Sequence, residues 1–462
     1  MSTSLKSRRG DGESFDRFSN IPDYILLEIL TLLPTKDIAR MSLVSKRFRE
    51  LCLYVPDLFL DFASHSLENL GNWTERFLTL RDGAKLRRFA LTTSNSLGPT
   101  QIDRVCKWIH NATVICNAEE LDLSLEMSEE ESIYLPLSIF LRTVNFRLGR
   151  GILKLPSSIS TSSFSSLQVL EIRSFFAPQN LEEDWVSSLF PVIKKLNLEV
   201  ISDLNNLNII SSSLECLTLM VCGLLSVIVS ADRLQTLHVE YCYESSSYKW
   251  DGWLFRIYAP SLQKINWCQD QFAFYGSSIC LQSASFDATR LVQCADVLLQ
   301  YIKHAKSVTL RDRFLEEDIF TQDLGLLDNV QNLELELPCG NEDRKMPALA
   351  TFFTRLPNVK TLTMRDIEYC IFGYNESHDF DIEYWESQEV AFILHLKEVE
   401  IEIHHWGFEV GLIKYLIKHA TALERITVTF SRHVGISRSP ICKELSEFHE
   451  TFSCATLDFV LE

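Results

Sequence analysis

One short apolar pattern recurs along most of this 462-residue chain and restricts the folds that it can adopt. The pattern is L-x-x-L-x-L or a close variant. It ends in an alternation of apolar and polar residues, which is typical of a short strand with one buried face. With the middle apolar residue as the marker, fourteen copies fall at positions 89, 121, 144, 170, 196, 217, 237, 265, 284, 308, 333, 362, 399 and 426.

Most steps between these markers are 19 to 29 residues long, which is the period of leucine-rich repeats. A single strand per step cannot bury its apolar face, so neighbouring repeats must stack. We therefore predict an α/β fold: a curved solenoid from about 80 to 430, with parallel strands on its concave face. The alternative is a globular α/β domain, and fourteen regularly spaced copies argue against it.

Two stretches between the repeats have helical apolar spacing and are expected to cover the back of the strand layer. The first has its apolar face at Ile102, Val105, Cys106 and Ile109. The second has its apolar face at Ile413, Leu416, Ile417 and Ala420.

Composition excludes several classes of function. Lys and Arg total 44 against 62 Asp and Glu, a net charge of −18, which argues against a nucleic-acid partner. The longest apolar runs, such as 224–229, are far shorter than the roughly 18 residues of a membrane helix, so we predict no membrane partner. The odd number of cysteines, 13, and the absence of an export pattern favour reduced thiols in the nucleus, the cytoplasm or both.

No motif predicts catalysis. The chain lacks H-E-x-x-H, paired C-x-x-C, G-x-S-x-G, and both glycine-rich phosphate-binding signatures. His404 and His405 are adjacent on a predicted strand, so their side chains point to opposite faces. Cys106, Cys242 and Cys370 lie in apolar surroundings and are interpreted as buried filler. We predict no catalytic residue, no metal ligand and no cofactor.

Residues 20–51 are apolar and helix-patterned. Asn20 is predicted to cap a first helix with Pro22 in its first turn, and Pro34 to end it. Thr35 is predicted to start a second helix, and residues 42–51 a third. Three short helices cannot enclose all of the apolar side chains that these patterns contain. Several left in water would each forfeit roughly 1.5–3 kcal/mol, so we predict a partner surface.

The motifs in this stretch resemble an F-box. They are the I-P-D opening, L-x-x-I-L, L-P-x-K-D and S-x-V-S-K-R-F-R, with Phe48 where many members have Trp. Three further segments resemble plant F-box/leucine-rich-repeat proteins. The segments "YVPDLFLDF" and "RVCKWIHNATVICNAEELDLSL" resemble the start of their repeats. The tail from "LKEVEIEI" onward resembles their FBD-type end. "YWESQEVAFILHL" lacks the usual V-P-x-C-L.

The resemblance implies four regions and a function. The regions are a disordered N-terminus over 1–16, an F-box over 17–60, leucine-rich repeats over 61–390, and FBD-like repeats with a cap over 391–462. It implies a non-catalytic subunit of a Skp–cullin–F-box ubiquitin ligase that binds a Skp-type adaptor, and through it cullin and RING subunits, and presents an unidentified protein substrate. The alternatives are a scaffold without ligase activity and a small-molecule-dependent receptor. The predicted adaptor contacts, some of which must belong to the F-box core, are Ile21, Pro22, Leu26, Ile29, Leu30, Leu43, Val44 and Phe48.

An acidic segment, 374–389, has no repeat pattern and is interpreted as an exposed loop. Its aromatic side chains are candidate contacts for a protein substrate, because aromatic residues anchor many interfaces. They are Tyr374, Phe380, Tyr384 and Trp385. A loop without a partner is the alternative.

Overall fold

A computed structural model of the chain describes residues 21–461 except 63–66, 82–83, 156–163, 178–181, 223, 225, 241–253, 269–282, 288–301, 312–324, 338–341, 367–379, 404–407 and 431–437. The predicted disordered N-terminus, Cys242, Cys370, His404 and His405 lie outside the described residues. The chain divides into two compact units, Met1–Ser157 and Ser158–Glu462. Among the described helices, none has the length and apolar character needed to cross a membrane.

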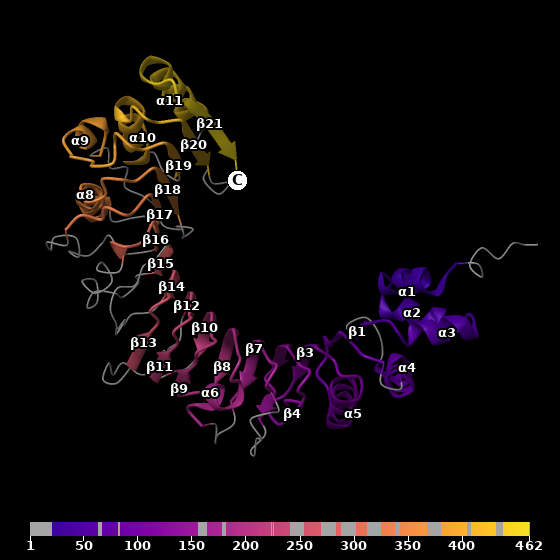
Figure 1. Cartoon of the computed structure of the whole chain (residues 1–462). Coiled ribbons are helices and arrows are strands. Elements are labelled where there is room, and N and C mark those ends of the chain that lie inside the picture. Colours follow the sequence, from indigo (N-terminus) through magenta and orange to yellow (C-terminus); the bar gives the residue numbers. More distant parts are fainter. Residues whose placement is uncertain are drawn as a thin grey trace, which may run out of the picture. The chain divides into compact units, whose positions relative to one another are not determined.

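The first unit begins with three short helices and continues with alternating strands and helices (Figure 1). Its elements are α1 (Asp23–Thr31), α2 (Thr35–Met41), α3 (Lys46–Cys52), β1 (Asp57–Asp61), α4 (Leu67–Leu80), β2 (Arg88–Thr92), α5 (Pro99–His110), the π-helix η1 (Asn111–Ile115), β3 (Glu120–Met127), β4 (Ser132–Tyr134), β5 (Thr143–Gly149) and β6 (Ile152–Lys154).

Four strands of this unit form a parallel sheet in the order β1, β2, β3, β5. Their register aligns Leu58, Phe89, Leu121 and Val144, each of which is buried. The last three are sequence markers, and Leu58 adds a repeat that the sequence analysis did not include. Strands β4 and β6 form a separate short parallel pair.

The second unit contains most of the repeats. Its elements are β7 (Val169–Phe176), α6 (Trp185–Leu189), β8 (Lys195–Ser202), β9 (Asn206–Ile210), β10 (Cys216–Cys222), β11 (Ser226–Ser230), β12 (Thr236–Glu240), β13 (Leu254–Tyr258), β14 (Lys264–Cys268), β15 (Ser283–Asp287), β16 (Ser307–Arg311), β17 (Asn332–Leu337), α8 (Glu342–Phe353), β18 (Thr361–Asp366), α9 (Ile382–Glu386), β19 (Glu398–Ile403), α10 (Phe408–His419), β20 (Arg425–Phe430), α11 (Arg438–Phe452) and β21 (Thr456–Leu461).

Twelve strands of the second unit pair in parallel, from β7 and β8 through β10, β12 and β14 to β21 in chain order. The register aligns all eleven sequence markers of this unit, from Leu170 to Ile426, and continues to Leu457. The eleven marker side chains are buried because each packs between its neighbours in the stack, as a repeat architecture requires, whereas Leu457 in the last strand is only partly buried.

Strands β9, β11 and β13 form a second parallel sheet that the marker pattern does not predict. The apolar run at 224–229 lies largely in β11, where Val227 and Val229 are buried. This second row of strands occupies the connections between the main strands, where helices were expected.

The two predicted helical stretches are confirmed as α5 and α10. In α5, Ile102, Val105 and Ile109 are buried as expected, whereas Cys106 is only partly buried and Trp108 fills the core. In α10, the whole predicted face is buried. Helices α8 to α11 lie along one side of the strands from β16 to β21 (Figure 1). The predicted fold class is confirmed: N-terminal helices precede parallel sheets built from short repeated strands.

Candidate functional site

The three N-terminal helices share a small core. Helix α3 contacts both α1 and α2. The side chains that fill the space between them are Leu26, Leu30, Ile38, Phe48 and Cys52. All five are at most 9% exposed, so this core is closed without any further partner.

Polar contacts fix how these helices begin. Pro22 occupies the position before α1, and Pro34 the position before α2. Pro22 therefore precedes the helix rather than lying in its first turn, and Asn20 lies outside the described residues. The Ser45 hydroxyl accepts a hydrogen bond from Phe48 N at 3.2 Å and caps α3. Arg47 donates to the Asp23 carboxylate at 2.6 Å, which ties α3 to the start of α1.

A second set of apolar side chains on the same helices faces solvent. They belong to α1 and to the turn that joins α2 and α3. Their exposed fractions are 68% for Tyr24, 38% for Ile25, 41% for Ile29, 83% for Leu32, 76% for Leu43 and 67% for Val44. Six large apolar side chains on a stretch this short form an unusual surface, because scattered single exposures are the norm.

The structure separates the predicted contact residues into two groups. Leu26, Leu30 and Phe48 are core residues, whereas Pro22, Ile29, Leu43 and Val44 are exposed and Ile21 is partly buried. The sequence analysis missed the exposed Tyr24, Ile25 and Leu32. Helix α1 is apolar on nearly every side, and this pattern indicates burial on more than one face. The pattern could have identified these three residues as contacts.

Hydrogen bonds join the N-terminal helices to the first repeat. The buried Arg81 donates to Val55 O at 2.8 Å and to Lys85 O at 2.7 Å. Burial lowers the pKa of this guanidinium. Phe59 N, in β1, donates to the Thr35 hydroxyl at 3.0 Å. These contacts make the helices and the first repeats one structural body within the first unit.

The predicted substrate contacts are mostly not on the surface. Tyr374 lies outside the described residues. Phe380 is 8% exposed and Trp385 fully buried, and Tyr384 packs between them, with ring centroids 4.9 and 5.4 Å away. The predicted exposed loop is wrong for residues 382–386, which form helix α9 and pack on α10. Asp381 starts this helix, because its carboxylate accepts from Glu383 N and Tyr384 N.

The cysteine environments in the first unit do not support nucleophilic chemistry. Burial raises the pKa of Cys52 to about 11, and it also raises the pKa of Cys106 and Cys116. A thiol with a raised pKa carries little thiolate near neutral pH, and the thiolate is the reactive form. Among the described residues, no group of three or more His, Cys, Asp and Glu side chains is placed to hold a metal ion.

Comparison with known proteins identifies the N-terminal helices. Residues 18–60 match the F-box domain, so the chain contains an F-box. A putative F-box/FBD/LRR-repeat protein of Arabidopsis thaliana is 28% identical over 96% of this chain and 95% of its own length. An FBD-associated F-box protein from the same plant is 41% identical over 19% of this chain and 20% of its own. The predicted resemblance to plant F-box/leucine-rich-repeat proteins is confirmed.

Proposed function

We propose that this chain is the substrate-recognition subunit of a Skp–cullin–F-box ubiquitin ligase. The F-box binds a Skp-type adaptor, and the repeats bind a protein substrate. The observation that carries this proposal is the exposed apolar surface of the F-box: Tyr24, Ile25, Ile29, Leu32, Leu43 and Val44. We call these six residues the F-box surface.

The free energy gained by burying the F-box surface favours binding to a partner. Burying a large aliphatic side chain completely contributes roughly 1.5–3 kcal/mol, and these six side chains are already partly shielded. Their combined burial still supplies several kcal/mol, the scale of a specific protein contact. Exposed apolar residues on adjacent helix faces are the usual way in which helices bind an apolar groove.

The hydrogen bonds between the F-box and the first repeat fix the orientation of this surface relative to that repeat. A ligase subunit that carries no catalytic group acts by holding the substrate near the enzyme that modifies it. Arg81 and Thr35 fix the F-box against the first repeat, so the adaptor-bound end keeps a defined orientation within its unit. In this proposal the cullin and RING subunits, reached through the adaptor, supply the chemistry.

The proposal is tested by co-expression with a Skp-type adaptor and a cullin. We expect the wild-type chain to copurify with both. The variant Leu43→Asp/Val44→Asp should lose the adaptor without unfolding, because both side chains are exposed. The matched control is Leu394→Asp, which places the same charge at a leucine of the second unit that is 61% exposed and should leave adaptor binding intact.

Two outcomes would contradict the proposal. Equal solubility and monodispersity of the chain with and without the adaptor would argue against adaptor binding. Copurification of the adaptor without cullin would favour the scaffold without ligase activity.

A further inference from the structure

The sheet of the second unit has an outer face of polar side chains, and the positions on β7, β8, β10 and β12 form two rows across the strands. One row contains Glu171, Asn197, Thr218 and His238, and the next contains Arg173, Glu199, Met220 and Glu240. Neighbouring strands lie about 4.8 Å apart, so adjacent members of a row are in contact range.

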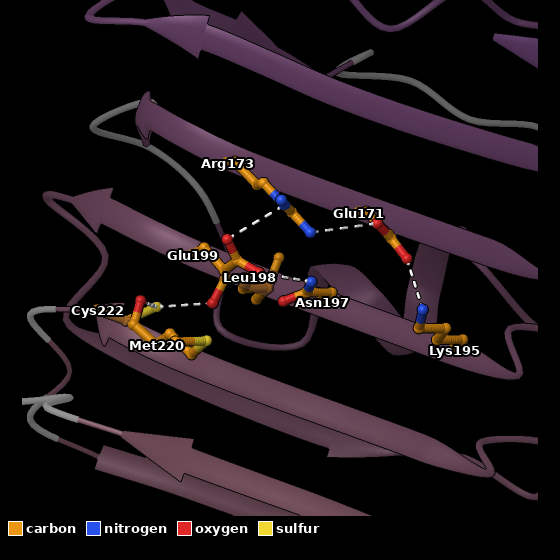
Figure 2. A network of polar contacts seen from close by, with 8 residues as sticks. All are labelled: Glu171, Arg173, Lys195, Asn197, Leu198, Glu199, Met220 and Cys222. Carbon is orange, nitrogen blue, oxygen red and sulfur yellow. Dashed lines mark hydrogen bonds and ion pairs between the residues drawn. The ribbon is translucent and has the colours of Figure 1, made fainter. Parts of the chain in front are cut away.

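The charges on this face are paired with one another (Figure 2). Arg173 Nε lies 3.1 Å from Glu199 Oε2, and Lys195 Nζ lies 2.6 Å from Glu171 Oε1. On the other side, His238 Nε2 lies 3.1 Å from Glu240 Oε2. Two ion pairs and a histidine–glutamate contact therefore surround Thr218 and Met220, the uncharged positions of β10, and Asn197 lies beside them on β8 between Lys195 and Glu199. These three uncharged residues form the centre of this face.

Asn197 lies in this centre with half of its amide satisfied. Its Nδ2 donates to Glu199 Oε1 at 2.8 Å (Figure 2). Its Oδ1 has no hydrogen-bond partner among the described residues, although the side chain is only 6% exposed. Leaving a buried acceptor unpaired costs free energy, because the oxygen has lost its water without gaining a donor. A group that donates a hydrogen bond to this oxygen would recover that energy.

Two strained valines adjoin the same centre. Val200 and Val221 have φ values of 51° each, and the register places them opposite each other on β8 and β10. The left-handed backbone costs free energy for a residue with a side chain, and it is rare for β-branched residues. Their side chains are 48% and 47% exposed, so burial in the folded chain does not offset this cost. Asn or Gly would suit the backbone better.

We propose that Asn197, Val200, Thr218, Met220 and Val221, which we call the β8–β10 patch, bind an uncharged, extended segment of a protein partner. An amide N–H of that segment donates to Asn197 Oδ1, and its aliphatic side chains cover Val200, Val221 and Met220. The inference rests on the proposed function, in which this partner is the ligase substrate.

Charge complementarity determines the class of partner. A charged group at the centre would have to compete with the ion pairs Arg173–Glu199 and Lys195–Glu171, whose partners already satisfy each other. An uncharged donor meets no such competition. In protein interfaces, most of the binding energy comes from contacts that are shielded from water at the centre and surrounded by polar groups. The neighbouring Met220 is long and unbranched, so rotation of its side chain can admit the donor.

The test uses a library of random peptides displayed on phage and the full chain purified with a Skp-type adaptor. We expect the selected peptides to be uncharged, and synthetic versions to bind Asn197→Leu about tenfold or more weakly than the wild type. The variants Val200→Asn and Val221→Asn should also weaken binding while raising the melting temperature, because Asn tolerates the left-handed backbone. Asn208→Leu is the matched control: its Oδ1 is also buried and unpaired, but it lies in β9 of the other sheet.

Three outcomes would overturn the inference: selection of no peptide, selection of peptides dominated by Lys and Arg, or equal binding to the wild type and Asn197→Leu. Melting curves of every variant separate loss of the patch from loss of the fold. Adaptor binding is measured in the same samples. If the wild type binds the adaptor but no peptide depends on Asn197, this inference alone fails; if the wild type does not bind the adaptor, the proposed function fails.

Discussion

The F-box and the repeats use the same kinds of apolar residue in opposite ways. In the repeats, the marker residues such as Leu217, Leu237 and Leu333 are at most 1% exposed. In the F-box, Leu32 and Leu43 are 83% and 76% exposed. Each repeat buries its leucines against the next repeat, so the chain itself supplies the partner. Among the described residues, no neighbour covers the outer side chains of the F-box in this way, and a second protein is the natural substitute.

This difference indicates which substitutions affect folding and which affect binding. A change at a repeat marker removes contacts on both sides of the strand, because every strand packs between two others. In the proposed function, a change on the F-box surface mainly removes contacts with a partner.

The largest expected effect is that of Leu237→Asp in β12. Leu237 is fully buried and aligned with Leu217 and Ile265 on the adjacent strands, so the substitution would place an unpaired carboxylate in the core. We expect a loss of about 5 kcal/mol, or unfolding of the neighbouring repeats. Circular dichroism and limited proteolysis measure it. The control is Thr236→Asp, on the outer face of the same strand. A similar loss of stability in this variant would mean that the assignment of the two faces as buried and outer is wrong.

The F-box contains both kinds of leucine and provides a second comparison. Leu30 is 1% exposed and Leu43 is 76% exposed. We expect Leu30→Ala to cost about 3 kcal/mol of unfolding free energy, and Leu43→Ala to change it by less than about 0.5 kcal/mol. Chemical denaturation measures both. Leu43→Ala should be the variant that weakens adaptor binding, and the reverse assignment would contradict the division of the F-box into core and surface.

The sequence predicted the strands better than it predicted the contact residues. The three markers of the first unit and the eleven of the second fall in register within their own units, because a one-residue error would move a whole strand's apolar set to the wrong face. In the F-box, the predicted adaptor contacts on the first helix include two core residues, Leu26 and Leu30, and one exposed residue, Ile29. Helical spacing alone cannot identify the outer face when a helix is apolar on several sides.

The segment around α9 shows a second limit of sequence reasoning. Acidic residues and the absence of a repeat indicated a loop, but Trp385 contacts Phe353 and lies in the core. The contact depends on a residue far away in the sequence, which no local pattern reveals. The β8–β10 patch was also invisible to the sequence analysis, because it depends on two strands being in register and on the left-handed backbone at Val200 and Val221.

Gly411 tests whether the α9 segment is packed or loosely attached. A Cβ at this position would overlap the carbonyl oxygen of Phe380 and lie 2.9 Å from Asp381 Cα. Ala is normally better than Gly inside a helix by about 1 kcal/mol, so stabilisation is expected if the segment can move away. If it cannot, overpacking makes Gly411→Ala destabilising by about 1–3 kcal/mol, and this is the result we expect. Thermal unfolding measures the sign.

Gly98→Ala is the control for this substitution. Gly98 lies at the start of α5, where the only atom near an added Cβ is Gln101 Oε1 at 3.8 Å. We expect a destabilisation of at most about 1 kcal/mol, since Ala is a poorer N-cap than Gly. A destabilisation equal to that of Gly411→Ala would remove the evidence for close packing of α9 on α10.

The last comparison concerns the closed core of the F-box, and it uses Cys52 as a probe. Its thiol is 1% exposed, lies 3.5 Å from Ile38 O, and has a pKa raised by burial from 9.0 to about 11. The protonated thiol therefore stabilises the folded state fully below pH 9, where both states keep the proton. This contribution is lost as the pH rises from 9 towards 11, because the unfolded thiol ionises first. The unfolding free energy of the wild type should fall more steeply across this window than that of Cys52→Ala.

In the native chain, iodoacetamide should modify the exposed Cys454 and spare Cys52, whose thiolate fraction is about a hundredfold lower than that of a free thiol. Equal modification of the two cysteines would show that the F-box core opens readily. The closed structure would then not identify which apolar side chains are free to bind a partner.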